Sequence, residues 1–290
     1  MQRFGFDHES LSSINPKIIT LSSTAFGYTG PWRRAGSRAR TVDAACGLSS
    51  LTGYEGGPSL RASNNYMDHS VGNNVAYALL LALYQRRKTG IGMRIDLTMQ
   101  ETGVSAIGPA ILEAQRDITR QRLGCSHIWK SPHNVYPTIG DDRWIAISVM
   151  SDAEWVNLKR AMDEPDWANN HNYDTVEGRS ESRNRLDEEL ASWTVSQDNK
   201  TLMHHLQTHN VCCAAVYTAE DLLSDSHFDS REFFLTVENK AVPSVGPRQF
   251  AGRPFRSSRI PTGIDTVCLL YTSDAADEGL GVDLGGRRII

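Results

Sequence analysis

The sequence predicts an α/β protein with a larger first region and a smaller second region of the same class. Three observations support this class. Apolar segments at 18–22, 93–99 and 143–150 have the composition or alternation of strands. The segment at 70–88 has apolar residues at helical spacing, and it separates two of these strands. Strands that alternate with long helices are typical of α/β folds with parallel sheets.

The chain begins with short elements and loops. Residues 7–15 have the form of a short helix, and the apolar β-branched run at 18–22 predicts a strand. A loop rich in turn-forming residues is expected at 22–36, and a second irregular, glycine-rich segment is expected at 46–65.

The long helix at 70–88 is the clearest element of the sequence. It ends in three cations, which favour a helix C-terminus, and Gly90 follows as its C-cap. Residues 93–99 then alternate as a strand does, and we expect a further helix from Gln100 to about Arg122.

The second region has the pattern of a small α/β module. It contains, in order, a strand at 143–150, a helix announced by the capping box at 151–154, a helix with Leu186, Leu190 and Trp193 on its buried face, a strand at 211–217 and a short helix at 218–223. Prolines and glycines between 238 and 262 predict an extended segment.

Composition excludes several classes of function. The chain of 290 residues has 22% charged residues and a net charge of −4, which gives no general attraction to nucleic acid or to an anionic membrane. The run from Val75 to Tyr84 is shorter than the roughly 20 apolar residues of a bilayer span. Five cysteines without metal-site spacing fit reduced thiols, so we expect a cytoplasmic protein without a metal site.

Asp68 is the residue that best carries a chemical hypothesis. It lies in the run Tyr66 to Gly72, just before the long predicted helix, where unpaired N–H groups and the helix dipole favour an anion. This position fits a helix N-cap and also fits a catalytic carboxylate whose reaction develops an oxyanion nearby. Spacing alone leaves both interpretations open.

Four segments resemble the class III CoA-transferases, the family of formyl-CoA transferase, carnitine CoA-transferase and α-methylacyl-CoA racemase. They are NPKIITLSSTAFGYTGPW (15–32), CGLSSLTG (46–53), YMDHSVGNNVAYALLLALYQRRKTGIGMRIDLTMQE (66–101) and SPHNVYPTIGDDRWIAISV (131–149). The resemblance implies a Rossmann-like large domain, incomplete here, with a small α/β domain, in a homodimer of interlocked chains.

The resemblance also implies the chemistry. Asp68 matches the family's nucleophile, which attacks an acyl-CoA thioester and forms a mixed anhydride and then an aspartyl-CoA thioester. Coenzyme A and acyl-CoA are then substrates, a small carboxylic acid is the acceptor, and no tightly bound cofactor, metal, nucleic acid or membrane is expected.

Other candidate residues are weaker. Arg38 and Arg40 are candidates for contacts with CoA phosphates, or they are solvated surface arginines. Gly27 is a turn residue or a point where backbone approaches CoA. Ser131, Pro132, His133 and Asn134 correspond to the segment where formyl-CoA transferase has a glycine-rich lid. This chain lacks those glycines, which puts a mobile lid in doubt, but a role in acceptor selection stays open.

Two alternatives belong to other kinds of function. A racemase of the same family needs a histidine ahead of the aspartate, and no histidine occurs between His8 and His69. A non-catalytic CoA-binding fragment would not need a carboxylate at position 68.

The expected organisation has four parts. Residues 1–122 form the later part of the large domain with the Asp68 motif, 123–237 form the small domain, and 238–267 begin the return to the large domain. Residues 268–290 resemble the translation of a sequencing adapter rather than protein. A helix and strand at the very start suggest that earlier βα units are missing, so we expect the chain to be an inactive internal fragment.

Overall fold

The computed structural model describes residues 2–61, 66–238 and 246–259. The chain divides into two compact units, Met1–Cys213 and Ala214–Ile290. The tail at 268–290 and the end of the expected extended segment lie outside the described residues. Within the described residues, no helix combines the length and the apolar character needed to cross a bilayer.

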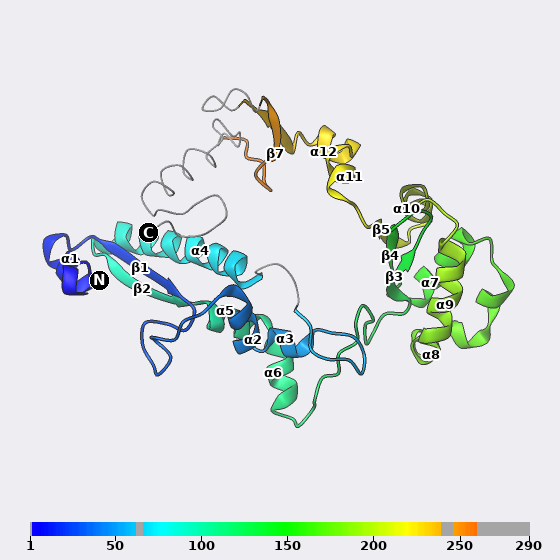
Figure 1. The fold of residues 1–290 in the computed structure, drawn as a ribbon, viewed down its shortest axis with the longest axis horizontal. Coiled ribbons are helices and arrows are strands. Elements are labelled where there is room, and N and C mark those ends of the chain that lie inside the picture. Colours follow the sequence, from blue (N-terminus) through cyan, green and yellow to red (C-terminus); the bar gives the residue numbers. More distant parts are fainter. Residues whose placement is uncertain (1, 62–65, 239–245, 260–290) are drawn as a thin grey trace, which may run out of the picture. The chain divides into compact units, whose positions relative to one another are not determined.

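A parallel βαβ arrangement forms the first half of the first unit (Figure 1). Strands β1 (Ile19–Thr24) and β2 (Met93–Thr98) pair in parallel, with Ile19 opposite Met93. Helix α4 (Tyr66–Thr89) contacts both strands. The other helices here are α1 (His8–Ile14), α2 (Ala39–Ala45), α3 (Leu48–Leu51), α5 (Met99–Ala106) and α6 (Gly108–Ala114), after the 3₁₀ turn η1 (Gln2–Phe4).

Most of the expected elements are present in this half, but some of their bounds differ from those expected. The helix expected at 100–122 is wrong as a single element: it is interrupted at Ile107, and Pro109 lies in the first turn of α6. A proline lacks the N–H that a continuous helix needs, which makes it a favourable first-turn residue of a new helix. The expected irregular segment at 46–65 also contains α3, a single helical turn that follows the left-handed Gly47 at φ +87°.

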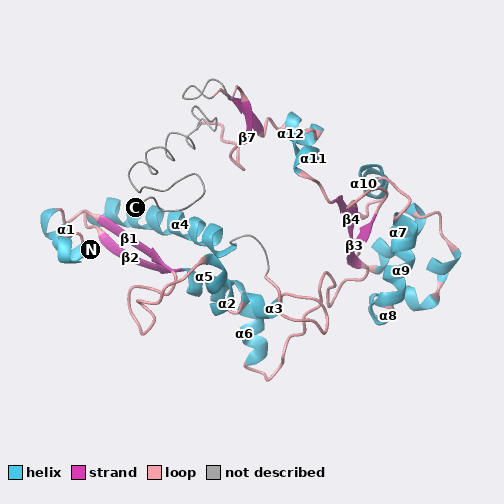
Figure 2. Ribbon diagram, in the orientation of Figure 1, coloured by secondary structure: helices cyan, strands magenta, loops and turns pink. Residues whose placement is uncertain are grey.

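The second half of the first unit is a three-stranded sheet covered by helices (Figure 2). Strands β3 (His133–Pro137), β4 (Trp144–Ser148) and β5 (Cys212–Ala215) lie in the order β3-β4-β5, and β3 and β4 are antiparallel. The last two residues of β5 are counted with the second unit. The helices are α7 (Asp152–Ala161), α8 (Val176–Glu181), α9 (Arg183–Thr194) and α10 (Asn199–Thr208), with 3₁₀ turns η2 (Asp166–Asn169) and η3 (His171–Tyr173).

The core of this half confirms the predicted helix faces. Trp155 and Leu158 of α7 and Leu186 and Leu190 of α9 are fully buried, together with Tyr136 of β3. Ser151 caps α7, as the capping box predicts, by accepting from the Glu154 N–H at 3.2 Å.

The second unit contains two short helices and a hairpin. They are α11 (Ala219–Leu223), α12 (Ser226–Ser230), β6 (Phe234–Val237) and β7 (Arg248–Ala251), and β6 and β7 pair antiparallel. Thr218 caps α11 in the expected place, in a capping box with Asp221.

Candidate functional site

Asp68 lies inside the first turn of α4. The expectation that the helix begins at Ser70, with Asp68 ahead of it as a cap, is therefore wrong. The four residues that precede Tyr66 lie outside the described part of the chain. A carboxylate in the first turn still faces the positive end of the dipole, which stabilises an anion by about 0.3–1 kcal/mol.

The turn that carries Asp68 is fixed by its neighbour Met67. Met67 is fully buried and forms a core cluster with Val42 of α2 and with Cys46, the residue that caps the end of α2. Gly103 of α5 permits this approach, since a Cβ there would lie 2.5 Å from the Cys46 sulfur and 2.7 Å from the Met67 sulfur. Asp68 itself is half-buried, and within the described residues its side chain makes no hydrogen bond. The backbone of the turn thus fixes the position of Asp68, and its carboxylate has no partner among the described residues.

The same cluster places the turn at the carboxyl edge of the strand pair. Ala25 follows β1 directly, Met99 follows β2 directly, and both pack against the cluster around Met67. In α/β sheets, ligands bind beyond the carboxyl ends of parallel strands. Asp68 therefore stands beside the edge of the sheet where this fold class has its ligand sites.

Gly27 lies in the loop that leaves this edge. It is buried with φ +89°, and its N–H donates to the Thr24 hydroxyl at 2.9 Å. A Cβ at this position would lie 2.9 Å from the Thr98 side chain. These constraints explain the glycine as a turn residue, and its contact with CoA stays a prediction.

Arg38 and Arg40 lie at the start of α2, which contacts α4 and α5. Both side chains are exposed, and neither guanidinium pairs with an acid among the described residues. The structure thus brings two free cations onto a helix that packs beside the Asp68 turn. Their contact with phosphate stays a prediction.

Asp43 is a residue that sequence reasoning missed. It lies on α2 beside the core residue Val42, it is 1% exposed, and both carboxylate oxygens lack a hydrogen-bond partner within the described residues. A buried unpaired carboxylate is costly. The signal in the sequence was an acid enclosed by apolar residues, in the run TVDAAC.

Ser131, Pro132, His133 and Asn134 are held firmly at the start of β3. Ser131 and Pro132 are buried, and the Ser131 carbonyl accepts from the Arg179 Nε at 2.6 Å. The Asn134 amide donates to Asp187 at 2.9 Å. These contacts explain why the segment has the geometry of a strand rather than that of a mobile glycine lid.

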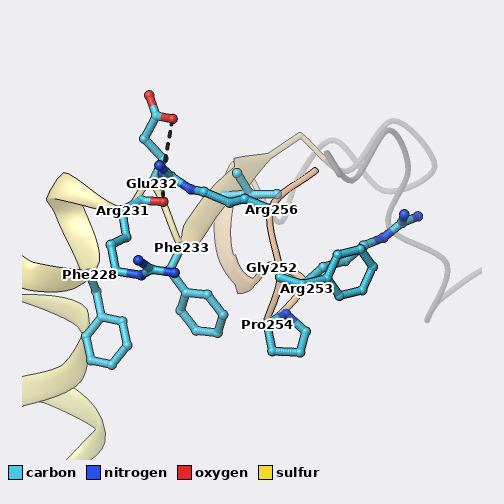
Figure 3. Close-up of a pocket in the computed structure, with 10 residues that line it drawn as sticks. Phe228, Arg231, Glu232, Phe233, Gly252, Arg253, Pro254 and Arg256 are labelled. Carbon is cyan, nitrogen blue, oxygen red and sulfur yellow. Dashed lines mark hydrogen bonds and ion pairs between the residues drawn. The ribbon is translucent and has the colours of Figure 1, made fainter. Parts of the chain in front are cut away.

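The second unit contains a pocket that the sequence did not predict. It has a volume of about 680 Å³ and a lining of aromatic and cationic side chains. Figure 3 shows Phe228 and Phe233 on one side and Pro254 and Arg253 on the other. Arg256 lies 3.5 Å from the Glu232 carboxylate, so this cation of the pocket is already paired with an acid. Among the described residues, no group of three His, Cys, Asp or Glu side chains is arranged to hold a metal ion.

A family model, described as CoA-transferase family III, matches residues 1–267. The succinyl-CoA–D-citramalate CoA-transferase of Chloroflexus aurantiacus is 29% identical over 91% of this chain and 65% of its own length. The succinyl-CoA:mesaconate CoA-transferase of Haloarcula marismortui is 27% identical over 100% of this chain and 73% of its own length.

Two further similarities extend the comparison. The formyl-CoA:oxalate CoA-transferase of Streptomyces coelicolor is 24% identical over 93% of this chain and 68% of its own length. The structure of a CAIB/BAIF family protein from Brucella suis superimposes with a TM-score of 0.78 at 22% identity, over 91% of this chain and 68% of that one. The chain thus spans just under two thirds of the Chloroflexus relative, and its α/β fold is shared with the solved structure.

Proposed function

Because the chain belongs to CoA-transferase family III, we propose that it moves coenzyme A from an acyl-CoA to a carboxylic acid, with Asp68 as the covalent nucleophile. The observation that carries the proposal is the position of Asp68. Its carboxylate is half-buried in the first turn of α4, and it has no hydrogen-bond partner among the described residues. The positive end of a helix dipole favours an anion, and a carboxylate without a partner there can act as a nucleophile.

In the first half-reaction, an Asp68 oxygen attacks the carbonyl carbon of the donor thioester. The carbon–sulfur bond breaks, and CoA leaves as a thiolate while the acyl group remains on Asp68 as a mixed anhydride. The thiolate then attacks the aspartyl carbonyl carbon. This step breaks the anhydride, releases the donor acid and leaves CoA on Asp68 as a thioester.

The second half-reaction reverses these steps with a new acid. The acceptor carboxylate attacks the aspartyl-CoA carbonyl and expels the thiolate, which gives an anhydride between Asp68 and the acceptor. The thiolate attacks the acceptor carbonyl, and the new acyl-CoA leaves as Asp68 is restored. Each addition forms an oxyanion, and N–H groups at the start of α4 are suitable donors for it.

Arg38, Arg40 and Gly27 are assigned to the binding of CoA. The two exposed guanidinium groups are suited to the phosphates of CoA. Gly27 has no side chain, so the backbone there can lie close to CoA. No tightly bound cofactor is required for this chemistry. The protein is assigned to the cytoplasm.

The acceptor is assigned to the dicarboxylic acids. Citramalate, mesaconate and oxalate, which stand in the names of three relatives, all carry two carboxylates. One carboxylate receives CoA, and the other is available for recognition.

The domain boundaries that we propose are those expected from the sequence. We assign residues 1–122 to the large domain with the nucleophile, 123–237 to the small domain and 238–267 to the return segment, in a homodimer with interlocked chains.

The test is CoA transfer from succinyl-CoA to mesaconate by a protein that carries this sequence within the full length of its relatives. Asp68→Asn keeps the size of the side chain but removes the anionic nucleophile, so transfer should fall by at least about 10³-fold, in the range of a lost covalent nucleophile. His69→Ala is the matched control, because the exposed His69 has no assigned role and should be replaceable. An Asp68→Asn protein with undiminished transfer, and without deamidation, would exclude the covalent mechanism.

A further inference from the structure

Three cationic or titratable side chains gather at the turn that leads into β3. An isolated β-bridge joins His127 to Lys130, so the chain reverses direction between them. The turn brings the ring of His127 to 5.4 Å from the ring of His133 and to 5.7 Å from the ring of Trp129. We call His127, Lys130 and His133 the cation cluster.

One nitrogen of each imidazole is already engaged. The Trp129 N–H donates to His127 Nδ1 at 3.1 Å, which puts the proton of a neutral His127 ring on Nε2. His133 Nδ1 lies 2.8 Å from the Ser148 hydroxyl, and this bond fixes its ring. Within the described residues, no hydrogen bond is made by either Nε2. Two fixed rings therefore each keep one nitrogen for a ligand.

The electrostatics of the cluster are unbalanced. The pKa of His133 is lowered by burial first, then by Lys130 and His127, so each influence acts in the same direction. Two acids that follow β4 already have other partners. Asp152 lies 3.0 Å from Arg179, and Glu154 accepts from the Met150 N–H at 2.7 Å. A bound anion would relieve the repulsion within the cluster.

Asp187, the acid on the facing helix α9, is also committed. It accepts from the Asn134 amide at 2.9 Å and from the Tyr136 hydroxyl at 2.6 Å. The positive charge of the cluster thus has no acid partner within the described residues.

We propose that the cation cluster binds a small dicarboxylate through one of its carboxylates. The two imidazole Nε2 atoms and the Lys130 ammonium supply donors for a two-oxygen anion. The exposed side chains of Ile128 and Trp129 supply an apolar surface beside it for a short carbon chain. This proposal does not depend on the proposed function of Asp68.

The backbone between Lys130 and His133 is fixed by burial and by a hydrogen bond. Ser131 and Pro132, between Lys130 and His133, are buried, and Arg179 holds the Ser131 carbonyl. A site fixed in this way binds without first ordering its donors, which favours affinity for a small ligand.

The test is a histidine NMR titration of the whole chain with succinate, without any acyl-CoA. Binding should raise the pKa of His133 and shift the His127 resonances, because a nearby anion favours imidazolium. Succinamide has the same carbon chain without charge and should cause no shift. Lys130→Met should weaken succinate binding by about tenfold, the effect of losing one hydrogen bond to a charged group. Lys159→Met on α7 is the matched control and should bind as the wild type does.

The outcomes separate the cluster from the nucleophile. An Asp68→Asn protein should still show the succinate shifts, since binding does not involve Asp68. If succinate produces no shift in the wild type, or if only the phosphates of 3′,5′-ADP do so, the proposal is overturned even where Asp68 is shown to be acylated.

Discussion

Replacement of Arg179 by methionine should destabilise the second half of the first unit by about 3–5 kcal/mol. Arg179 is fully buried, and its guanidinium donates to the Ser131 carbonyl at 2.6 Å, the Tyr173 carbonyl at 2.8 Å and the Asp152 carboxylate at 3.0 Å. Methionine fills much of the volume but donates to none of them.

The magnitude follows from what the substitution leaves behind. Each carbonyl loses its charged donor, at about 1–3 kcal/mol for a buried unsatisfied group. The Asp152 side chain is 56% exposed, so water replaces its partner and the loss is at most about 1 kcal/mol. Arg179→Lys should recover little, because one ammonium cannot reach three acceptors that a planar fork spans.

The assay is urea unfolding followed by tryptophan fluorescence. Trp155 reports on this region, since the Arg179 guanidinium lies 5.6 Å from its ring. Arg160→Met, on an exposed position of α7, is the matched control and should change the free energy of unfolding by less than about 0.5 kcal/mol. An Arg179→Met protein within about 1 kcal/mol of the wild type would refute the reasoning.

Three further predictions concern packing, protonation and thiol reactivity. Gly103→Ala should lower the free energy of unfolding in urea melts, since a Cβ there would lie 2.5 Å from the Cys46 sulfur and overpacking costs about 1–3 kcal/mol. Gly72→Ala in α4 is the control: its Cβ meets nothing within 4 Å, so the free energy of unfolding should rise by up to about 1 kcal/mol. Because the pKa of His133 is lowered in the folded state, the unfolded chain takes up that proton first, so stability should fall as pH drops through about 6.5, and His133→Gln should reduce this slope in urea melts. Burial, with a smaller effect of the neighbouring thiol, raises the pKa of Cys213 to about 11, so iodoacetamide at pH 8 should label the exposed Cys125 and spare Cys213 in a peptide map.

Each of these three predictions can be contradicted by a specific result. Equal stability of the two glycine variants would show that α5 has room at Gly103. An unchanged pH slope in His133→Gln would assign the slope to other groups, and rapid labelling of Cys213 in the folded chain would show that its thiol is accessible.

Sequence patterns located the elements whose ends are marked by local chemistry. The Ser151 cap of α7, the Thr218 cap of α11 and Gly90 after α4 each define a boundary within a few residues. Strands β1 and β2 were found because their apolar residues run together or alternate. These signals depend on neighbours along the chain, so no tertiary information is needed to detect them.

What the sequence missed depends on contacts between distant residues. Helix α2 has no periodic apolar face long enough to stand out, and it is fixed by packing of Val42 against Met67. The burial of Asp43 follows from the same packing. His127 and His133 come together only because a turn reverses the chain between them. Asp68 was identified by its motif, but its place inside α4 required the structure.

The proposed covalent role of Asp68 is tested most directly by mass spectrometry of a protein that carries this sequence within the full length of its relatives, after incubation with succinyl-CoA and trapping with hydroxylamine or borohydride. We expect a modification on the peptide that contains Asp68, at that residue alone, and none in Asp68→Asn. Transfer of CoA with no adduct at Asp68, or with an adduct on another side chain, would contradict it.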